Sequence, residues 1–374
     1  MISINFSNTV PLNDLGRGAH EQVNDLMTCI SEVVKTGNFV LGEQVKKFEA
    51  ELAEYVKVPF ASGVANGTDA LEIALRAIGA RQSDIILATA NAGGYARTAA
   101  ERIGCATDYI DTEEYSALIS IDSLKQYLKT GKSPAAVVVT HLYGNMADTR
   151  AITEICKNYG VAVVEDCAQS IGASLAGEMS GSIGKVSTFS FFPTKNLGAL
   201  GDGGAVLTSD IEVAERVKSL RQYGWSSKYH VDSTGGFNSR LDEIQASVLS
   251  YRLKNLEADN SRRRRILSEY ATAMSGKDVA GIWSLDTSSV GHLAVVRVGN
   301  RESFQRHFRN LSIETGIHYP ILDTDQKAWS ILDSYDLINS KKLQQEIVTI
   351  PCFPTMTEEE ISRVVSALRT YEEN

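Results

Sequence analysis

The apolar and polar positions of the chain alternate between two kinds of pattern. Within residues 43–55, apolar side chains recur at the spacing of one face of an amphipathic helix. Residues 134–140 and 161–164 are instead short, continuous apolar runs, which is typical of strands buried on both faces of a parallel sheet. A helical pattern over residues 151–159 lies between these runs. Strand, helix and strand at this spacing form a βαβ unit, so the pattern predicts an α/β fold.

The same patterns predict the remaining elements and a division of the chain. Residues 1–19 have no regular pattern. Because 374 residues exceed what one small core can hold, we expect a large domain over residues 1–256 and a small C-terminal domain over residues 257–374. Further helices are expected over residues 20–35, 66–78, 241–256, 301–310 and 358–371, and further strands over residues 60–65, 84–88, 186–192, 205–207 and 292–298.

Composition and charge narrow the class of protein. Apolar residues make up 43% of the chain and charged residues 22%, which is ordinary for a globular protein. The net charge of -9 argues against nucleic acid as a general partner, because phosphate neutralisation needs a basic face. The basic run Arg262 to Arg265 is the exception, and we interpret it as a solvated or intersubunit face of a helix.

The cysteines and the apolar runs indicate in which compartment of the cell we expect the protein. The five cysteines are scattered and never form a C-x-x-C pair, which fits reduced thiols in a cytoplasm and predicts neither a disulfide framework nor a metal site. No run approaches the roughly 20 apolar residues of a membrane span, so no membrane association is expected.

The chemistry-bearing residues follow two of the expected strands. The strand over residues 186–192 stops at Pro193, which places Lys195 on a turn. A lysine there is a solvated charge, a phosphate clamp or a Schiff-base nucleophile. The Ser190 hydroxyl, five residues upstream, is suited to bind phosphate, and the strand over residues 161–164 leads to the carboxylate of Asp166. Pyridoxal phosphate (PLP) needs this combination, because a lysine binds its aldehyde and a carboxylate keeps its ring nitrogen protonated.

Two further positions have both a functional and a structural interpretation. Gly67 and Thr68 open an expected helix, where free backbone amides make a phosphate site, although Thr is also an ordinary helix cap. His141 follows the strand over residues 134–140, where open α/β sheets bind ligands, although a lone histidine is usually structural.

Six stretches carry a resemblance to a known family. In chain order, they resemble motifs of the DegT/DnrJ/EryC1/StrS family of PLP-dependent sugar-nucleotide aminotransferases, and they span most of the sequence. They are Asn66-Gly-Thr-Asp-Ala-Leu71, His141-Leu-Tyr-Gly144, Glu165-Asp-Cys-Ala-Gln-Ser170, Ser190-Phe-Phe-Pro-Thr-Lys195, Gly201-Asp-Gly-Gly204 and Gly236-Phe-Asn-Ser-Arg-Leu-Asp-Glu-Ile-Gln-Ala246.

The resemblance implies a fold and a cofactor site. The fold is aspartate-aminotransferase-like (fold type I), with a mostly parallel, mixed sheet in the large domain. Lys195 carries the PLP cofactor, Asp166 pairs with its ring nitrogen, Tyr95 stacks on the ring and Gln169 reaches its phenolic oxygen. The cofactor phosphate is held by Gly67, Thr68 and Ser190, together with Asn238 of the partner subunit.

The resemblance also implies a substrate class and an assembly. It implies a homodimer with shared active sites, L-glutamate as the amino donor, and a nucleotide-linked 3- or 4-keto-6-deoxysugar as the acceptor. We expect thymidine diphosphate as the carrier, and an amino sugar for a surface glycan such as O-antigen, or for an antibiotic, as the product. The expected substrate contacts are His141, His318 and Tyr319 for hydroxyls, and Arg221, Tyr223, Lys228 and Tyr229 for diphosphate and base.

Two segments depart from the family pattern and favour amination at C3. Residues 91–97 contain a double glycine and Arg97 where the family has a proline, and residues 321–326 lack the family's proline, leucine and histidine. Two alternatives stay open. One is a PLP sugar 3-dehydratase of the same family, although those enzymes have histidine at the position of Lys195. The other is a non-catalytic PLP-fold regulator.

Overall fold

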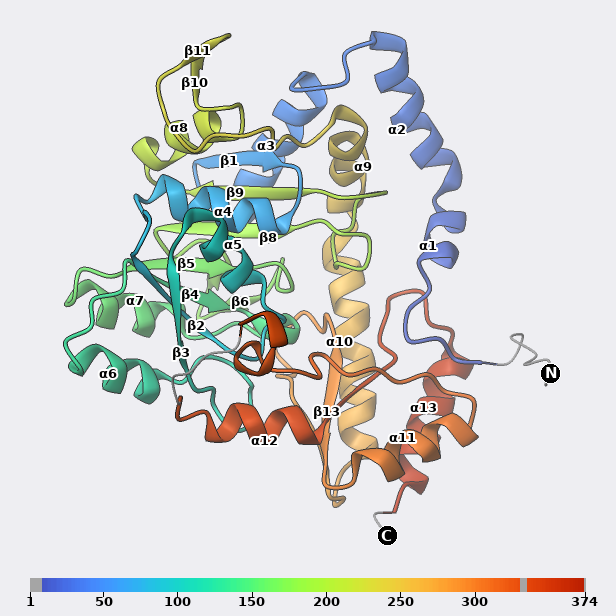
Figure 1. The fold of residues 1–374 in the computed structure, drawn as a ribbon. Coiled ribbons are helices and arrows are strands. Elements are labelled where there is room, and N and C mark those ends of the chain that lie inside the picture. The colour runs from blue at the N-terminus through green and yellow to red at the C-terminus, as the bar shows by residue number, and fades with distance from the viewer. Residues whose placement is uncertain (1–8, 330–334, 373–374) are drawn as a thin grey trace.

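The computed structural model, which describes residues 9–329 and 335–372, is built around a seven-stranded sheet (Figure 1). The strand order is β1-β9-β8-β5-β4-β2-β3. The inner pairs from β8 to β3 are parallel, whereas β9 is antiparallel to both of its neighbours, so the predicted mostly parallel, mixed sheet is confirmed. The strands are β1 Phe60–Val64, β2 Ile85–Thr89, β3 Ala106–Ile110, β4 Ala136–Thr140, β5 Ala162–Asp166, β8 Val186–Ser190 and β9 Gly204–Thr208.

Helices cover both faces of this sheet, which explains the continuous apolar runs. Alternate residues of a strand point to opposite faces. In β4, Val138 packs into the core beneath α4, α5 and α8, whereas Val137 and Val139 pack into the core beneath α6 and α7. Both faces of the strand therefore need apolar side chains. The helices are α3 Glu43–Val56, α4 Gly67–Ala77, α5 Tyr95–Ile103, α6 Ile121–Lys129, α7 Thr149–Lys157, α8 Ile211–Leu220 and α9 Glu243–Leu253.

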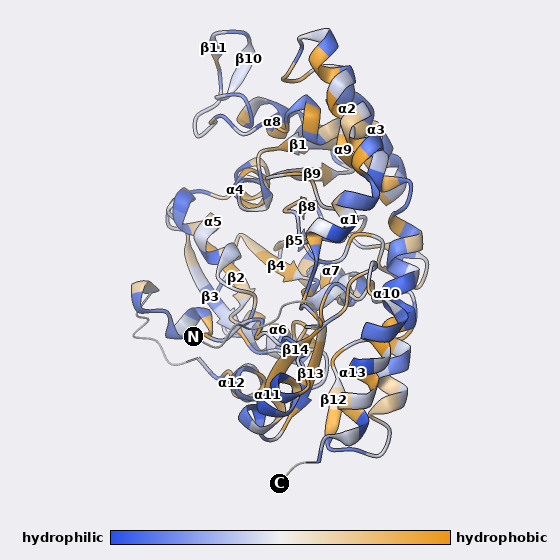
Figure 2. Cartoon of the chain, turned by 90° about the vertical axis from the view of Figure 1, so that its right-hand side faces the viewer, coloured by the Kyte–Doolittle hydropathy of each residue, from blue (hydrophilic) through white to orange (hydrophobic). Residues whose placement is uncertain are grey.

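The C-terminal part of the chain surrounds a second core. Its antiparallel sheet has the order β12-β13-β14, and β13 and β14 are orange in Figure 2, whereas α11 is mostly blue. Phe304 and Phe308 are fully buried in this core and stack at 4.4 Å between ring centroids. The division into domains at residue 256 stays a prediction. The elements are α10 Leu256–Ala273, β12 Val279–Gly281, β13 Ala294–Val298, α11 Arg301–Asn310, α12 Ile338–Glu346, β14 Ile347–Ile350 and α13 Glu358–Thr370.

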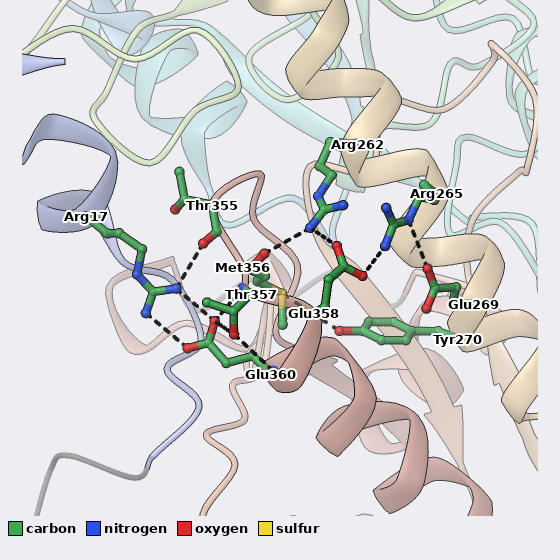
Figure 3. Close-up of polar contacts among 10 residues, drawn as sticks. All are labelled: Arg17, Arg262, Arg265, Glu269, Tyr270, Thr355, Met356, Thr357, Glu358 and Glu360. Carbon is green, nitrogen blue, oxygen red and sulfur yellow. Dashed lines mark hydrogen bonds and ion pairs between the residues drawn. The ribbon is translucent and has the colours of Figure 1, made fainter. Parts of the chain in front are cut away.

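The expected N-terminal helix over residues 20–35 is wrong in its extent. Helix α1 (Leu15–Glu21) begins earlier, and α2 (Val23–Thr36) follows it. The Asp14 side chain caps α1 by accepting a hydrogen bond from the Arg17 backbone at 2.9 Å. The Arg17 guanidinium donates to Glu360 at 2.8 and 3.0 Å and to the Thr355 carbonyl at 2.9 Å (Figure 3). These distant contacts stabilise a short helix. Its two glycines have a low helix propensity, so the sequence does not predict it.

Other elements also lacked a clear local pattern. The expected helix over residues 241–256 is shorter, because α9 ends at Leu253 and α10 begins at Leu256. Two small hairpins were not expected, namely β6 Ser174–Leu175 with β7 Glu178–Met179, and β10 Trp225–Ser227 with β11 His230–Val231. Among the described residues, no helix combines the length and the apolar character that a bilayer crossing requires.

The basic run on α10 holds this helix against neighbouring segments of the chain (Figure 3). Arg262 donates to the Met356 carbonyl at 3.1 Å and pairs with Glu358 at 2.6 Å, while Arg265 pairs with Glu269 and Glu358. Arg263 is only 5% exposed and donates to the Cys352 carbonyl at 2.7 Å. The expected solvated face is therefore wrong for the buried Arg263, whereas Arg265 remains half exposed, and the intersubunit alternative stays a prediction. Arg262, Arg263 and Arg265 fasten α10 to the start of α13 and to the segment before it.

Candidate active site

A cavity of about 590 Å³ lies where the carboxyl ends of the parallel strands approach the second sheet. Strand ends of β5 and β8 and the start of α4 form one side, and residues next to β13 and β14 form the other. This is the edge at which open α/β sheets bind ligands. The predicted site residues that line the cavity are Gly67, Thr68, Tyr95, Asp166, Ser190, Lys195, His318 and Tyr319.

Lys195 presents its amine to this cavity. It lies on a turn closed by a hydrogen bond from its backbone N–H to the Phe192 carbonyl at 2.8 Å. Burial lowers the pKa of Lys195, and the nearby Asp166 carboxylate opposes this shift. Within the described residues, Nζ has no hydrogen-bond or ion-pair partner. An amine with a lowered pKa and no partner is suited to act as a nucleophile or a base.

Asp166 ends β5 and is 5% exposed. Its Oδ1 accepts a hydrogen bond from the Ala168 backbone at 3.1 Å, and its Oδ2 accepts one from the Thr140 hydroxyl at 3.4 Å. Burial raises the pKa of Asp166, and the Ala168 N–H and the Lys195 charge oppose this shift. The carboxylate therefore has few partners of its own and is ready to pair with a cationic ligand group.

The start of α4 and the end of β8 together form an anion cradle. Asn66 caps α4, because its side-chain oxygen accepts from the Asp69 backbone at 2.8 Å, so Thr68 is not the cap. A methyl group added at Gly67 would lie 2.7 Å from Ser190 Cβ, so only glycine lets these elements approach so closely. Backbone amides at a helix start, beside two hydroxyls, suit a phosphate.

Aromatic side chains form one wall of the cavity. Tyr95 is the first residue of α5 and remains 47% exposed, and its ring lies edge-on to that of Tyr319 at 6.3 Å between centroids. Gln169 lies behind Tyr319, to whose hydroxyl it donates at 3.1 Å, and it accepts from the Tyr143 backbone at 2.7 Å. His318 is held by Thr349, with its Nδ1 2.8 Å from the Thr349 hydroxyl.

The structure does not support the expected ligand roles of His141 and Arg221, because neither side chain lines the cavity. His141 is fully buried, with Nε2 3.0 Å from Glu165 and Nδ1 accepting from the Ala147 backbone. Arg221 is 7% exposed, pairs with Glu49 and donates to the Gly63 carbonyl at 2.8 Å. Both side chains are buried and held by protein partners, although the Arg221 Nε has none within the described residues, so those expectations are corrected.

A buried cluster of His141, Glu165 and Cys167 has metal-ligand residue types. Glu165, however, also accepts hydrogen bonds from the Gly181, Ile183 and Gly184 backbones. Both nitrogens of His141 are engaged as described above. The cluster is thus a hydrogen-bonded support beneath the strand ends.

The other predicted residues lie on or beside the β10–β11 hairpin, which projects at the top of the molecule in Figure 1. Tyr223 is 40% and Tyr229 75% exposed, and the Lys228 amine lies 5.1 Å from the centre of the Tyr229 ring. Asn238 pairs with Gln222 at the base of the hairpin and is also exposed. None of these four side chains lines the cavity of its own chain.

Sequence reasoning missed three titratable residues that line the cavity, namely Asp202, His292 and Cys352. His292 precedes β13, is 6% exposed and lines the cavity. Its Nδ1 lies 2.9 Å from Asn196, the residue after Lys195. The available signal was a histidine opening an apolar strand, but nothing local showed that this strand would meet Lys195.

These features together fit PLP. Asp166 would face the ring nitrogen, Tyr95 would cover the ring, and Gly67, Thr68 and Ser190 would hold the phosphate. The close approach of Gly67 and Ser190 supports this interpretation most directly, because it brings the start of α4 and the Ser190 hydroxyl to the same side of the cavity.

Comparisons with known proteins agree with this site. The model of the DegT/DnrJ/EryC1/StrS aminotransferase family matches residues 21–369. The dTDP-3-amino-3,6-dideoxy-alpha-D-galactopyranose transaminase of Aneurinibacillus thermoaerophilus is 38% identical over 97% of this chain and 99% of its own. The crystal structure of DesV from S. venezuelae, in complex with a ketimine intermediate, is 32% identical, with a TM-score of 0.93 over 97% of this chain and 98% of its own.

A third relative shows the cofactor. NtdA from Bacillus subtilis, solved with bound cofactor PMP, is 26% identical, with a TM-score of 0.90 over 96% of this chain and 84% of its own. Sequence and structure thus match one family over nearly the whole chain. The chain belongs to the DegT/DnrJ/EryC1/StrS aminotransferase family of PLP-dependent transaminases.

Proposed function

We propose that this transaminase moves an amino group from L-glutamate to C3 of a dTDP-linked 3-keto-6-deoxysugar. The observation that carries the chemistry is the pairing, in one cavity, of the unpartnered Lys195 amine with the buried Asp166 carboxylate and an anion cradle. The substrate rests on the 38% identical relative, whose name describes a 3-amino-6-deoxysugar linked to dTDP.

The side chains of this protein have separate tasks in such a reaction. When bound, PLP supplies an aldehyde that takes up the amino group and a ring that accepts electron density. Lys195 Nζ, with its lowered pKa, takes a proton from the donor carbon and returns it at the acceptor carbon. Asp166 would keep the ring nitrogen of the cofactor protonated, and Tyr95 and Tyr319 would orient the reacting groups.

The proposed C3 specificity is supported by a contact between the two segments that depart from the family pattern. The Asp323 backbone donates to the Ala90 carbonyl at 2.8 Å, and a methyl group on Gly94 would lie 2.6 Å from the Trp329 ring. Trp329 in turn donates to Glu101 at 3.0 Å. Ala90 and Trp329 flank residues 91–97 and 321–326, so the two segments pack together near Tyr95. Their joint path would decide which sugar carbon comes within about 3–3.5 Å of the amine.

The substrate is tested by offering the dTDP-linked 3-keto and 4-keto isomers, and UDP-linked analogues, with glutamate. The position of the new nitrogen is located by NMR. We expect amination at C3 of the dTDP sugar. Amination only at C4 would refute the regiochemistry, and activity only on small keto acids would refute the sugar substrate. Loss of a sugar hydroxyl without nitrogen transfer would favour the dehydratase alternative, and absence of any turnover with bound PLP would favour the regulator.

We further propose a homodimer whose active sites are shared. Support comes from the exposed Tyr223, Lys228, Tyr229 and Asn238, which lie on or beside the β10–β11 hairpin and do not line the cavity of their own chain. If the hairpin reached the active site of a neighbouring subunit, its aromatic and cationic side chains would contact the nucleotide diphosphate there. Asn238 would contact the cofactor phosphate of that subunit. On this view the protein works in the cytoplasm, where nucleotide sugars are made.

Sharing is tested by mixing two inactive variants, Lys195→Ala and Asn238→Ala. If Asn238 acts across the interface, one intact composite site forms in each heterodimer and activity returns. If both residues serve their own subunit, neither site is intact. Activity that stays absent after proven subunit exchange would contradict sharing.

A further inference from the structure

The N-terminal segment 9–14 has no regular pattern in the sequence, yet it is fixed against the C-terminal part of the chain. Val10 is fully buried in the second core. Its backbone N–H donates to the Ser312 carbonyl at 2.9 Å, and its carbonyl accepts from the Glu314 backbone at 3.0 Å. The Leu12 backbone N–H donates to the Glu314 carboxylate at 3.0 Å. The segment therefore follows a defined path beside residues 312–314.

The other end of the segment is fixed as well. Asp14 caps α1, and Arg17 in its first turn is held by Glu360 (Figure 3). Leu12 also packs tightly, because a methyl group added at Gly316 would lie 2.9 Å from its Cδ2. Asn13 lies between these two anchored neighbours, so its backbone has a defined position.

Asn13 lies at the mouth of the cavity, where the cavity opens to solvent. It lines the cavity and is exposed, whereas Asp166, which lines the same cavity, is only 5% exposed. The Asn13 side chain has no hydrogen-bond partner among the described residues. A side-chain amide offers both N–H donors and a carbonyl acceptor. A ligand that extends from Asp166 towards solvent can therefore use both functions of Asn13.

The charges around the cavity indicate which part of a ligand suits its mouth. Among the described residues that line the cavity, Lys195 is the only lysine or arginine, and the carboxylates are Asp166 and the exposed Asp202. A diphosphate is bound best by cations, which the mouth of this chain does not supply from the described residues. Sugar hydroxyls are neutral and both donate and accept, so they match an amide and a carboxylate.

We propose that the Asn13 amide binds a hydroxyl of the sugar substrate at the mouth of the cavity, and that glutamate does not use this contact. Glutamate has no hydroxyl, and Asp202 at the mouth would repel its carboxylates. Asn13 is then a specificity-determining residue that contacts the sugar away from the reacting carbon. This inference rests on the proposed sugar substrate.

The test is Asn13→Ala, measured with each substrate separately. The two substrates of a transaminase react in separate halves of the reaction, so kcat/KM for each reports its own contacts. Loss of one neutral hydrogen bond should lower kcat/KM for the dTDP-linked keto sugar about three- to tenfold, through KM and not kcat. The value for glutamate should stay near wild type. Asn310→Ala, at an exposed asparagine that ends α11 outside the cavity, should change neither value.

Equilibrium binding separates the sugar from the nucleotide without any turnover. Asn13→Ala should weaken binding of the dTDP-linked amino sugar product by about the same three- to tenfold and leave binding of dTDP itself unchanged. Thermal unfolding checks that the variant is folded, which we expect because Val10 and Asp14 keep their own contacts.

Three outcomes would overturn this proposal alone. They are an unchanged kcat/KM for a sugar that the wild type aminates, an equal fall in kcat/KM for glutamate, and weaker binding of dTDP itself. A wild-type protein that neither aminates nor binds any dTDP- or UDP-linked sugar would instead refute the proposed function, and this inference with it.

Discussion

Two buried cations of this protein, Lys195 and Arg263, lie in opposite surroundings. Arg263 on α10 donates to the Cys352 carbonyl at 2.7 Å and to the Gly291 carbonyl at 3.5 Å, and the neighbouring arginines are paired with Glu257, Glu269 and Glu358. Lys195 lines a cavity of about 590 Å³, and its Nζ has no partner in the described structure. Arg263 thus donates to two backbone carbonyls, although its Nε has no acceptor, whereas Lys195 Nζ has no acceptor at all within the described residues.

The difference shows how burial serves packing in one region and reactivity in the other. A guanidinium keeps its charge when buried, so its donors fix the carbonyls of neighbouring segments. An ammonium group shifts its pKa readily, so burial turns Lys195 into a better nucleophile. The carboxylates of Glu358 and Asp166, which lie in these two regions, differ in the same way. Hydrogen bonds from Arg262 and Arg265 lower the pKa of Glu358, whereas burial raises the pKa of Asp166.

The strongest test of this contrast is Lys195→Ala. We expect transamination to fall by several orders of magnitude, because no other described lysine lines the cavity, while the protein stays folded since Nζ makes no hydrogen bond or ion pair within the described residues. Lys185→Ala is the matched control, because Lys185 is a surface lysine paired with Asp210. Borohydride reduction and peptide mapping should place the pyridoxyl label on Lys195. A label on Lys185 would refute the assignment.

Asp166→Asn should have the next largest effect on rate. An amide of the same size cannot hold a proton on the facing ring nitrogen, so the rate should fall by several orders of magnitude while some cofactor still binds. The measurements are turnover and cofactor absorbance on the same sample. Turnover like that of the wild type would show that the Asp166 carboxylate does not set the electronic properties of the ring.

On the arginine side of the comparison, Arg263→Met should affect stability more than chemistry. The substitution leaves the Cys352 and Gly291 carbonyls without their donor in a buried site, which should lower the free energy of unfolding by about 2–5 kcal/mol. Arg265→Met, on the same helix but half exposed and paired with Glu269, should lower the free energy of unfolding much less, because solvent screens an exposed ion pair. Urea unfolding measures both, and equal losses would show that burial does not distinguish the two arginines.

The sequence could predict those parts of the fold and of the site that depend on the order of neighbouring elements along the chain. Asp166 and Lys195 end strands or follow them, so their arrival at one sheet edge follows from the parallel order of β5 and β8. The same reasoning placed His141 in the site wrongly, because His141 lies one position beyond the residue whose side chain points to the site. Thr140 is the register partner of Asp166, and the next side chain turns away to Glu165.

The parts that sequence could not predict depend on distant partners. Arg221 is held by Glu49, which is 172 residues away, and nothing local indicates that pairing. Helix α1 depends on Arg17 reaching Thr355, which is 338 residues away. His292 enters the site only because the strand that follows it lies against the turn after Lys195. Long-range packing thus decided each of these outcomes.

The smallest expected effect concerns Asp323, a buried acid outside the proposed chemistry. It is 2% exposed, its Oδ1 has no hydrogen-bond partner, and the Tyr109 hydroxyl lies 3.4 Å from its Oδ2. Burial raises the pKa of Asp323 to about 7, and the hydrogen bond from Tyr109 only partly opposes this shift. A substitution of Asp323 therefore tests whether a buried carboxyl group with few hydrogen bonds must take part in catalysis.

Because the folded pKa of Asp323 lies above the unfolded value, its contribution to stability is present at low pH and is lost as the pH rises towards about 7. A tenfold change in an ionisation equilibrium is worth about 1.4 kcal/mol, so we expect wild type to lose about 1–3 kcal/mol between about pH 4 and 8 that Asp323→Asn does not lose. Urea unfolding across this range measures the difference, with Asp325→Asn, an exposed neighbour, as the control. Parallel pH profiles for wild type and Asp323→Asn would show that the carboxyl is ionised in the folded protein. A profile that separates as expected, together with near-normal turnover of Asp323→Asn, would show that burial alone does not make a group catalytic, and that Asp166 and Lys195 owe their reactivity to the cavity they share.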